Sequence, residues 1–285
     1  MTWEVAVAGT IHHDDITTPA GRRDVLGGSA VYFALAAARF APVHVNGIVG
    51  RDTAAEHRRI LERQRVDVGG MVVSAQPTFR WHAVHDFERW VTASESSEPG
   101  CDPEWRPALP DSSRRAEVLF VGSMDPRLQA EVIDQSRARL IGMDSMTVFM
   151  GDRAVEVHPL VERADILFLN TAELAALTGD ADWHGAAAAL CGRGRLRAVI
   201  VKRGPEGAVC VTASRVTAMP AVPVPEVVDP TGAGDALAGG FLGLLARLER
   251  DDDAAFADAL AEGLRCAANA IVEFGTAGLE TARTV

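Results

Sequence analysis

The sequence has few cysteines and no surplus of positive charge, and both absences narrow the possible functions. The four cysteines, Cys101, Cys191, Cys210 and Cys266, include no C-x-x-C pair. We therefore expect neither a disulfide framework nor a zinc ribbon, but a reduced, cytoplasmic protein. The net charge is −11 at pH 7, whereas nucleic acids and anionic membranes attract basic surfaces. We expect no nucleic-acid partner and no membrane partner.

Long apolar runs and several familiar motifs are also missing. No stretch approaches the roughly 20 consecutive apolar residues of a membrane span, and Met1–Glu4 has no basic region typical of a signal peptide. The chain contains no G-x-x-x-x-G-K-[ST] loop, no G-x-G-x-x-G after the first predicted strand and no H-E-x-x-H. It therefore gives no sign of the phosphate, dinucleotide or zinc sites that these motifs build.

An alternation of strand and helix patterns runs through most of the 285 residues. The predicted strands are Glu4–Ala8, His44–Val49, Glu117–Val121, Leu140–Met143, Asp165–Leu169 and Ala198–Lys202. The predicted helices are Ser29–Arg39, Asp52–Gln64, Arg127–Ala138, Glu173–Leu177, Trp183–Cys191, Asp235–Leu248 and Asp253–Glu273. Strands as uniformly apolar as Ile166–Leu169 are typical of a parallel sheet buried on both faces. We predict an α/β fold, a doubly wound and mostly parallel sheet with helices on both faces, as one domain over residues 1–285.

Two segments interrupt this alternation, residues 10–26 and about 71–95. Apolar and polar residues alternate over Thr78–Phe87, which places Phe79, Trp81, Ala83, His85 and Phe87 on one face. This pattern predicts either an edge strand of the main sheet or a small separate β-sheet that acts as a lid. The polar segment Ser94–Pro110 is predicted to be a loop.

The run Val228–Phe241 is the most informative part of the chain. A glycine-rich turn, with Gly232 and Gly234, leads directly into an apolar helix. The first N–H groups of a helix lack intrahelical partners and carry partial positive charge, so this turn is suited to bind an anion. A carboxylate there, Asp235, either takes a proton from a nucleophile that attacks a phosphate or caps the helix. An ordinary aspartate pKa of about 4 would leave Asp235 ionised at pH 7.

Other polar residues follow predicted strands. Side chains of consecutive residues in an extended segment point in opposite directions, so His12–Asp15 is a poor metal site, but one of its two aspartates can face a ligand at the sheet edge. The pair Gly27-Gly28 opens an alanine-rich helix, where tight packing is the alternative to ligand contact. Asn170 and Glu173 follow a buried strand, where the alternative is a helix cap.

In this order, these motifs resemble the ribokinase family, the PfkB-type carbohydrate kinases, over essentially the whole chain. The matching elements are Gly9…Asp14, Gly27-Gly28, Val49-Gly50-Arg51-Asp52, Asn170-x-x-Glu173, Leu177-Thr178-Gly179, Lys202-x-Gly204-x-x-Gly207 and Asp229–Asp235. The resemblance implies an enzyme that transfers the γ-phosphate of ATP to a hydroxyl. It implies that Asp235 is the base and that the amides of Gly232, Ala233 and Gly234 stabilise the moving phosphoryl group.

The resemblance also implies ATP and Mg²⁺ as cofactors, with K⁺ in some members. It places Asn170, Glu173, Lys202 and Gly204 near the nucleotide, with Glu173 contacting Mg²⁺ through water; for Lys202 the alternative is a strand-end surface residue. It assigns Asn269 and Gly275 to the wall of the adenine pocket. Asp229 and Thr231 occupy the positions where some members bind K⁺.

The resemblance assigns Asp14, Gly27 and Gly28 to the substrate, together with Tyr32 and Arg80, but the acceptor stays open. Tyr32 replaces the sugar-binding asparagine of ribokinase proper, and Asp144–Val148 lacks the arginine of the frequent Asp-x-Asn-x-Arg stretch. We expect a neutral polyol, a hexose or a cyclitol, with a nucleoside as the alternative. The lid aromatics stack on the substrate or form a homodimer contact. A catalytically silent sensor is less favoured because Asp235 and its glycines are intact.

Overall fold

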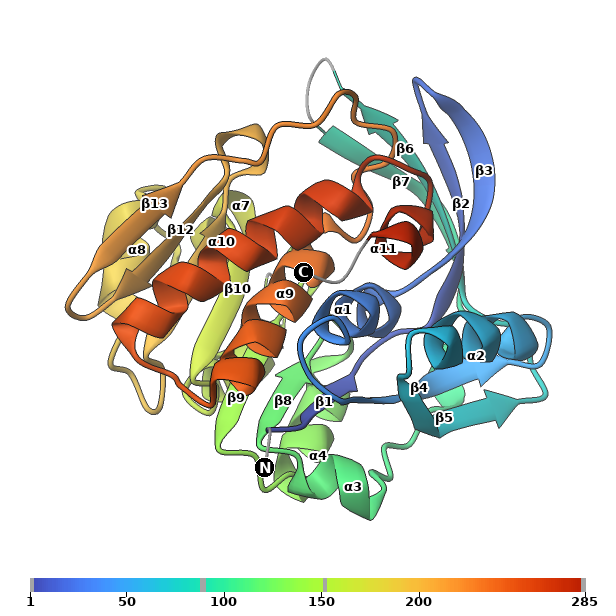
Figure 1. Cartoon of the computed structure of the whole chain (residues 1–285), viewed down its shortest axis with the longest axis horizontal. Helices are drawn as coiled ribbons and strands as arrows, with labels where there is room; N and C mark the ends of the chain where they lie inside the picture. The colour runs from blue at the N-terminus through green and yellow to red at the C-terminus, as the bar shows by residue number, and fades with distance from the viewer. Residues whose placement is uncertain (1–2, 88–90, 151–152, 283–285) are drawn as a thin grey trace.

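The computed structural model describes residues 3–87, 91–150 and 153–282, and within these it contains two β-sheets and their helices (Figure 1). The main sheet has the strand order β13-β12-β11-β10-β9-β8-β1-β4-β5. Its strands are β1 (Val5–Ala8), β4 (Val43–Gly50), β5 (Asp67–Ser74), β8 (Val118–Val121), β9 (Leu140–Asp144), β10 (Ile166–Asn170), β11 (Ala198–Lys202), β12 (Ala208–Thr212) and β13 (Val216–Met219). Only the β11–β12 and β12–β13 pairs are antiparallel among these residues.

The main sheet separates two apolar cores. Along β1, Val5 and Val7 contribute to one core, and Ala6 and Ala8 to the other, as the two-residue period of a strand requires. The first core includes residues of α1 (Ser29–Ala37), α2 (Ala54–Arg63), α9 (Ala233–Leu248), α10 (Asp253–Ala270) and α11 (Ala277–Thr281). Residues of α4 (Pro126–Gln135), α5 (Thr147–Met150), α6 (Ala154–Val161), α7 (Thr171–Thr178) and α8 (Trp183–Leu190) contribute to the second core. The predicted doubly wound α/β sandwich is confirmed.

Shorter helices complete the chain, and the described part contains no membrane-spanning candidate. These helices are η1 (Asp102–Glu104), α3 (Asp111–Arg115) and η2 (Gly204–Glu206). In the described residues, no helix combines the length and the apolar character needed to cross a bilayer.

The small sheet has the order β3-β2-β6-β7 and consists of two hairpins. Its strands are β2 (His12–Thr18), β3 (Gly21–Gly27), β6 (Arg80–Asp86) and β7 (Val91–Glu98). The central strands β2 and β6 are parallel, so residues near positions 15 and 83 lie side by side. In Figure 1 this sheet stands at one side of the main sheet, beyond α1 and α11.

The boundaries of the small sheet differ from the predicted segments. Met71–Ser74 belongs to β5, the edge strand of the main sheet, which contains two glycines and therefore has a weak strand pattern. Ser94–Glu98 forms the end of β7, although its sequence is as polar as a loop. Backbone pairing to β6 holds this strand, and such pairing needs no apolar side chains. The prediction of a loop over this part was wrong.

Candidate active site

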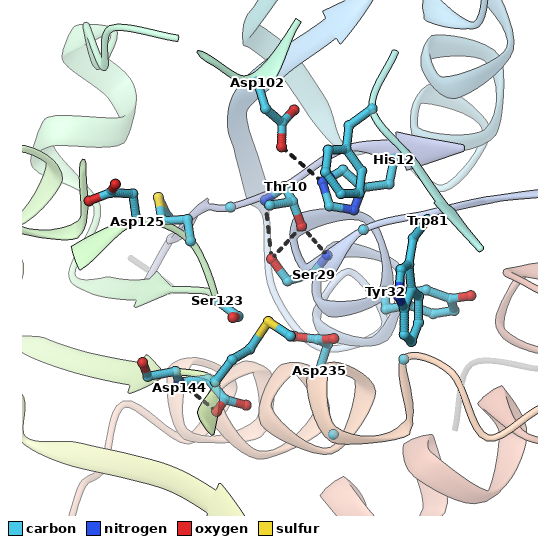
Figure 2. Close-up of a pocket in the computed structure, with 18 of the residues that line it drawn as sticks. Thr10, His12, Ser29, Tyr32, Trp81, Asp102, Ser123, Asp125, Asp144 and Asp235 are labelled. Carbon is cyan, nitrogen blue, oxygen red and sulfur yellow. Dashed lines mark hydrogen bonds and ion pairs between the residues drawn. The ribbon is translucent and has the colours of Figure 1, made fainter. Parts of the chain in front are cut away.

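A cavity of about 960 Å³ opens between the small sheet and the carboxyl ends of the main-sheet strands. Asp14, Trp81 and His85 line it from the small sheet, and Asp144 and Lys202 line it from the strand ends. Figure 2 shows Asp102 and His12 at one end and Asp144 and Asp235 at the other, with Thr10 and Ser29 between them. Ligands of open α/β sheets bind at this edge, beyond the carboxyl ends of the strands.

The N-terminus of α9 forms one wall of the cavity. Gly232 and Gly234 line it, whereas Ala233 does not, and the Ala233 N–H donates to the Pro230 carbonyl at 3.3 Å. Gly232 has a left-handed backbone (φ 75°), and a Cβ placed on it would lie 2.3 Å from the ring of Tyr32. Glycine is therefore required there for both conformation and space.

Asp235 lies in the first turn of α9 and lines the same cavity. Enclosure in the cavity raises the pKa of its carboxyl to about 7, and the carboxylates of Asp144 and Glu173 add to this. The cations nearby, Lys202 and His12, act in the opposite direction. This pKa is higher than the ordinary value expected from the sequence, because burial, the largest cause, and the neighbouring carboxylates are both produced by the fold.

Lys202 is part of this cluster of charges. Its ammonium lies 2.7 Å from Asp144 Oδ2 and 3.7 Å from Glu173 Oε2, and its side chain is only 17% exposed. These two carboxylates raise the pKa of Lys202 against the effect of burial. A Cβ placed on Gly234 would lie 3.2 Å from Lys202 Nζ, so the ammonium lies beside the first turn of α9. Lys202 is therefore a residue of the cavity and not a surface residue.

Asn170 and Glu173 form a capping box at the start of α7. The Asn170 side chain accepts a hydrogen bond from the Glu173 N–H at 2.8 Å, and Glu173 Oε2 accepts one from the Asn170 N–H at 2.7 Å. The helix-cap alternative is thus present. Glu173 lines the cavity as well, whereas Asn170 does not.

The acidic cluster fits a magnesium ion that is held mainly by water and phosphate. Oxygen ligands such as those of Glu173, Asp144 and Asp235 suit Mg²⁺, which usually keeps several waters. Among the described residues, no group of three or more histidine, cysteine or acidic side chains is arranged to hold a metal by itself. The oxygen atoms of Glu173, Asp144 and Asp235 suit an ion that is also bound by water and phosphate.

Asp14 is the buried polar group that faces the cavity from the small sheet. Its side chain is almost fully buried, and Oδ1 has no hydrogen-bond partner among the described residues. Burial raises the pKa of this carboxyl to about 6. The Tyr32 hydroxyl, also on the cavity, lacks a partner as well. Buried polar atoms are nearly always paired, so these two atoms are suited to a ligand's hydroxyl groups.

The glycine pair serves mainly to bring the two sheets together. Gly28 has a left-handed backbone (φ 100°), and a Cβ on it would lie 2.4 Å from the Thr10 carbonyl oxygen. Beside it, the Thr10 hydroxyl accepts from the Ser29 N–H at 3.0 Å, and the Ser29 hydroxyl accepts from the Thr10 N–H at 3.1 Å. Gly28 lines the cavity, and Gly27 lies behind Asp14, where a Cβ would be 2.6 Å from Oδ2.

Two charged residues of the small sheet, Asp15 and Arg80, do not line the cavity. His12 and Asp14 line the cavity, whereas Asp15 accepts a hydrogen bond from Arg22 at 2.7 Å. Arg80, predicted to bind substrate, forms an ion pair with Asp24 at 2.9 Å and does not line the cavity.

Asp229 and Thr231, predicted for K⁺, are bonded to protein groups. The two carboxylate oxygens of Asp229 accept from the N–H groups of Thr231 at 2.9 Å and Gly275 at 3.0 Å. The Thr231 hydroxyl is hydrogen-bonded to His85 Nε2 at 2.9 Å. Each of these oxygens therefore already has one hydrogen-bond partner in the protein.

The remaining nucleotide residues lie outside the cavity. Gly204 begins η2 with a left-handed backbone (φ 53°). Asn269 lines a second hollow of about 470 Å³, together with the loop Val222–Pro225. The structure thus gathers Glu173 and Lys202 with Asp235, but not Gly204, Asn269 or Gly275.

Several residues of the cavity belong to no motif of the sequence, among them Asp102, Phe149 and His85. Asp102, from η1, bonds to His12 Nε2 at 3.1 Å, and His12 stacks on Phe79 with 4.1 Å between ring centroids. Phe149 lies on α5. For His85 the only sequence feature is its position in the alternating pattern of a predicted strand. Of these, only the strand alternation at His85 gave a signal, because the other two come from segments with no motif.

Comparison with known proteins identifies relatives over the whole described fold. A profile described as pfkB family carbohydrate kinase matches residues 7–282. Cytidine kinase from Thermococcus kodakarensis is 27% identical over 84% of this chain and 87% of its own length. Aminoimidazole riboside kinase from Salmonella typhimurium is 36% identical over 80% of this chain and 76% of its own length. The structure of a fructokinase double mutant from Vibrio cholerae, in fructose-, ADP- and potassium-bound form, superposes with a TM-score of 0.77. The superposition covers 96% of this chain and 94% of the fructokinase chain, at 22% sequence identity.

Proposed function

The chain belongs to the pfkB family of carbohydrate kinases, and we propose that it transfers the γ-phosphate of ATP to a hydroxyl of the ribose of a nucleoside or a similar riboside. The family match makes the chain a phosphotransferase with a hydroxyl acceptor. One observation carries the rest of the proposal: Asp14, whose buried Oδ1 has no hydrogen-bond partner among the described residues, and the helix-terminal Asp235 line the same cavity.

Asp235 is the proposed base. The acceptor oxygen forms a bond to the γ-phosphorus, the bond from that phosphorus to the ADP oxygen breaks, and the hydroxyl proton passes to the Asp235 carboxylate. The N–H groups of Gly232 and Gly234 and the ammonium of Lys202, three residues that line the cavity, would stabilise the charge on the phosphoryl oxygens. Mg²⁺, when bound near Glu173, would neutralise charge on the phosphates.

The cavity wall supports a riboside over a simple sugar. Four aromatic residues line the cavity: Tyr32, Phe79, Trp81 and Trp105. Aromatic faces of this extent suit the planar ring of a base. Two relatives at 27% and 36% identity are named for cytidine and aminoimidazole riboside. A neutral hexose or cyclitol, the acceptor that the sequence alone favoured, is the second candidate.

A panel of acceptors tests this function. ADP release would be measured with ATP, Mg²⁺ and each of several nucleosides, hexoses and cyclitols, with the Asp235→Asn protein as a blank for contaminating kinases. Turnover confined to ribosides supports the proposal, whereas turnover on hexoses or cyclitols alone contradicts the riboside assignment. Replacing K⁺ by Na⁺ in the same assay tests whether a K⁺ requirement exists.

The rate should depend on the ionisation of Asp235. Because the pKa of its carboxyl is raised to about 7, protonation removes the base as the pH falls through 7. We expect kcat/KM for ATP to fall about tenfold per pH unit on the acid side of that value. Asp144→Asn removes a carboxylate that raises this pKa, so the fall should move to lower pH. A profile flat between pH 5 and pH 8 would contradict the assignment.

We further propose a homodimer through the small sheet. In the described part of the chain, its outer strands β3 and β7 each pair with one neighbour only, and such edges are suited to contact a second copy. Light scattering on the purified protein tests this, since a molar mass equal to the 30.3 kDa chain would contradict it.

A further inference from the structure

A histidine of the small sheet is hydrogen-bonded to the turn that precedes α9. His85, on β6, is 6% exposed, and its Nε2 lies 2.9 Å from the Thr231 hydroxyl. Its Nδ1 lies 2.8 Å from the hydroxyl of Thr92, on the neighbouring strand β7. This contact joins two parts of the chain that are far apart in sequence and that enclose the cavity from opposite sides.

Both ring nitrogens of His85 are therefore occupied. A neutral imidazole has one donor and one acceptor nitrogen, and a threonine hydroxyl can serve as either, so both bonds can form at once. The ring also makes an edge contact with Trp81, with 6.4 Å between centroids. Although His85 lines the cavity, it has no ring nitrogen left for a substrate. Any effect on the reaction must pass through the groups that it holds.

The group that it holds is next to the proposed anion-binding turn. Thr231 precedes Gly232, and no side chain caps α9 at that glycine. The turn is fixed from one side by Asp229, which accepts the Thr231 N–H, and from the cavity side by His85. Because Gly232 has no side chain of its own to form a hydrogen bond, the bond to Thr231 is one of the contacts that can hold the direction of the following amides, beside the bond from the Ala233 N–H to the Pro230 carbonyl.

We propose that His85 is a positioning residue that couples the small sheet to the Gly232–Gly234 turn, so that the placement of this sheet over the substrate sets the direction of the amides. The inference rests on the proposed function, in which those amides stabilise the transferred phosphoryl group. It assigns to the small sheet a part in the chemical step in addition to covering the cavity.

His85→Phe tests this with His82→Phe as the matched control. The phenylalanine keeps the ring volume but removes both hydrogen bonds. His82 is on the same strand, bonds to Asp15 at 3.2 Å and does not line the cavity. We expect kcat of His85→Phe to fall about 10- to 100-fold, with a smaller change in KM for ATP, and His82→Phe to keep the wild-type kcat. Equal losses in the two variants, or an unchanged kcat in His85→Phe, would overturn the proposal.

Thr231→Val removes the other end of the same hydrogen bond and guards against misfolding of a single variant. If the two residues act as one unit, the double variant should be no slower than the slower single variant. Additive losses in kcat would show that they act independently.

Amide hydrogen exchange provides a readout that needs no acceptor. Exchange of the segment 228–241 should be faster in His85→Phe and in Thr231→Val than in the wild type or in His82→Phe. Unchanged exchange there would contradict the coupling even if the kinase activity is found. Faster exchange with no acceptor turned over by the wild type would leave the coupling supported and the proposed function contradicted.

Discussion

Replacing Asp235 by asparagine is expected to reduce turnover at least about a hundredfold while ATP binding survives. Asparagine keeps the shape of the side chain but cannot accept the hydroxyl proton, and removal of a positioned base typically costs about 10²–10⁴-fold in rate. Turnover is measured with the acceptor that the panel identifies, and ATP binding by calorimetry. The nucleotide should bind at least as tightly, because a negative charge near the phosphates is removed.

The stability of the same variant separates loss of the base from loss of the fold. The pKa of Asp235 is raised to about 7 in the folded protein, above its value in an unfolded chain, about 3.9. Asp235 therefore destabilises the folded state fully above pH 7, and this cost declines as the pH falls from about 7 to about 3.9. Asp235→Asn should accordingly raise the Tm at pH 8, in line with the trade-off between stability and activity at functional sites.

A matched control for this variant is Asp253→Asn. Asp253 also lies in the first turn of a long helix, α10, but bonds to Ser214 outside the cavity. It should keep the wild-type turnover. Unchanged turnover in Asp235→Asn would show that this residue is not the base. An equal loss of turnover in both variants would show that the loss comes from a disturbed helix start and not from the missing base.

The elements that form the sandwich could be predicted from sequence because their patterns are local. The strand Ala198–Lys202 has the predicted bounds, and α1 and α9 begin within two residues of the prediction. Part of the polar strand β7 was predicted to be a loop, and part of the glycine-containing strand β5 was assigned to the small sheet. Both segments form strands because of backbone pairing with neighbouring strands, and their own side chains give a weak strand pattern. Backbone pairing across a sheet leaves little trace in a single sequence.

The candidate site also has one part that the sequence could predict and another that it could not. Asp14, Glu173, Lys202 and Asp235 could be picked out because each follows a strand or opens a helix, and all four line one cavity. Their electrostatics could not be predicted, since the pKa of Asp235 depends on Asp144 and Glu173, which reach it only through the fold. The links from His85 to Thr231 and from His12 to Asp102 likewise exist only in three dimensions.

Replacing Asp14 by asparagine should lower kcat/KM for the acceptor about a hundredfold and change KM for ATP little. Its buried Oδ1 lacks a partner among the described residues, so an acceptor hydroxyl can donate to it in the cavity. A hydrogen bond to a charged group contributes about 1.5–3 kcal/mol, and a hundredfold loss corresponds to about 2.7 kcal/mol, so the loss of one such bond accounts for the expected effect. Steady-state kinetics with the acceptor varied at saturating ATP measures the change.

Asp15→Asn is the control that the chain itself offers. The two aspartates are consecutive on β2, but Asp15 bonds to Arg22 and His82 away from the cavity. Its replacement should lower the Tm slightly and leave kcat/KM for the acceptor unchanged. If Asp15→Asn matched Asp14→Asn in kcat/KM, the loss would come from a disturbed small sheet. A loss confined to Asp14→Asn, with KM for ATP preserved, would place the acceptor between Asp14 and Asp235.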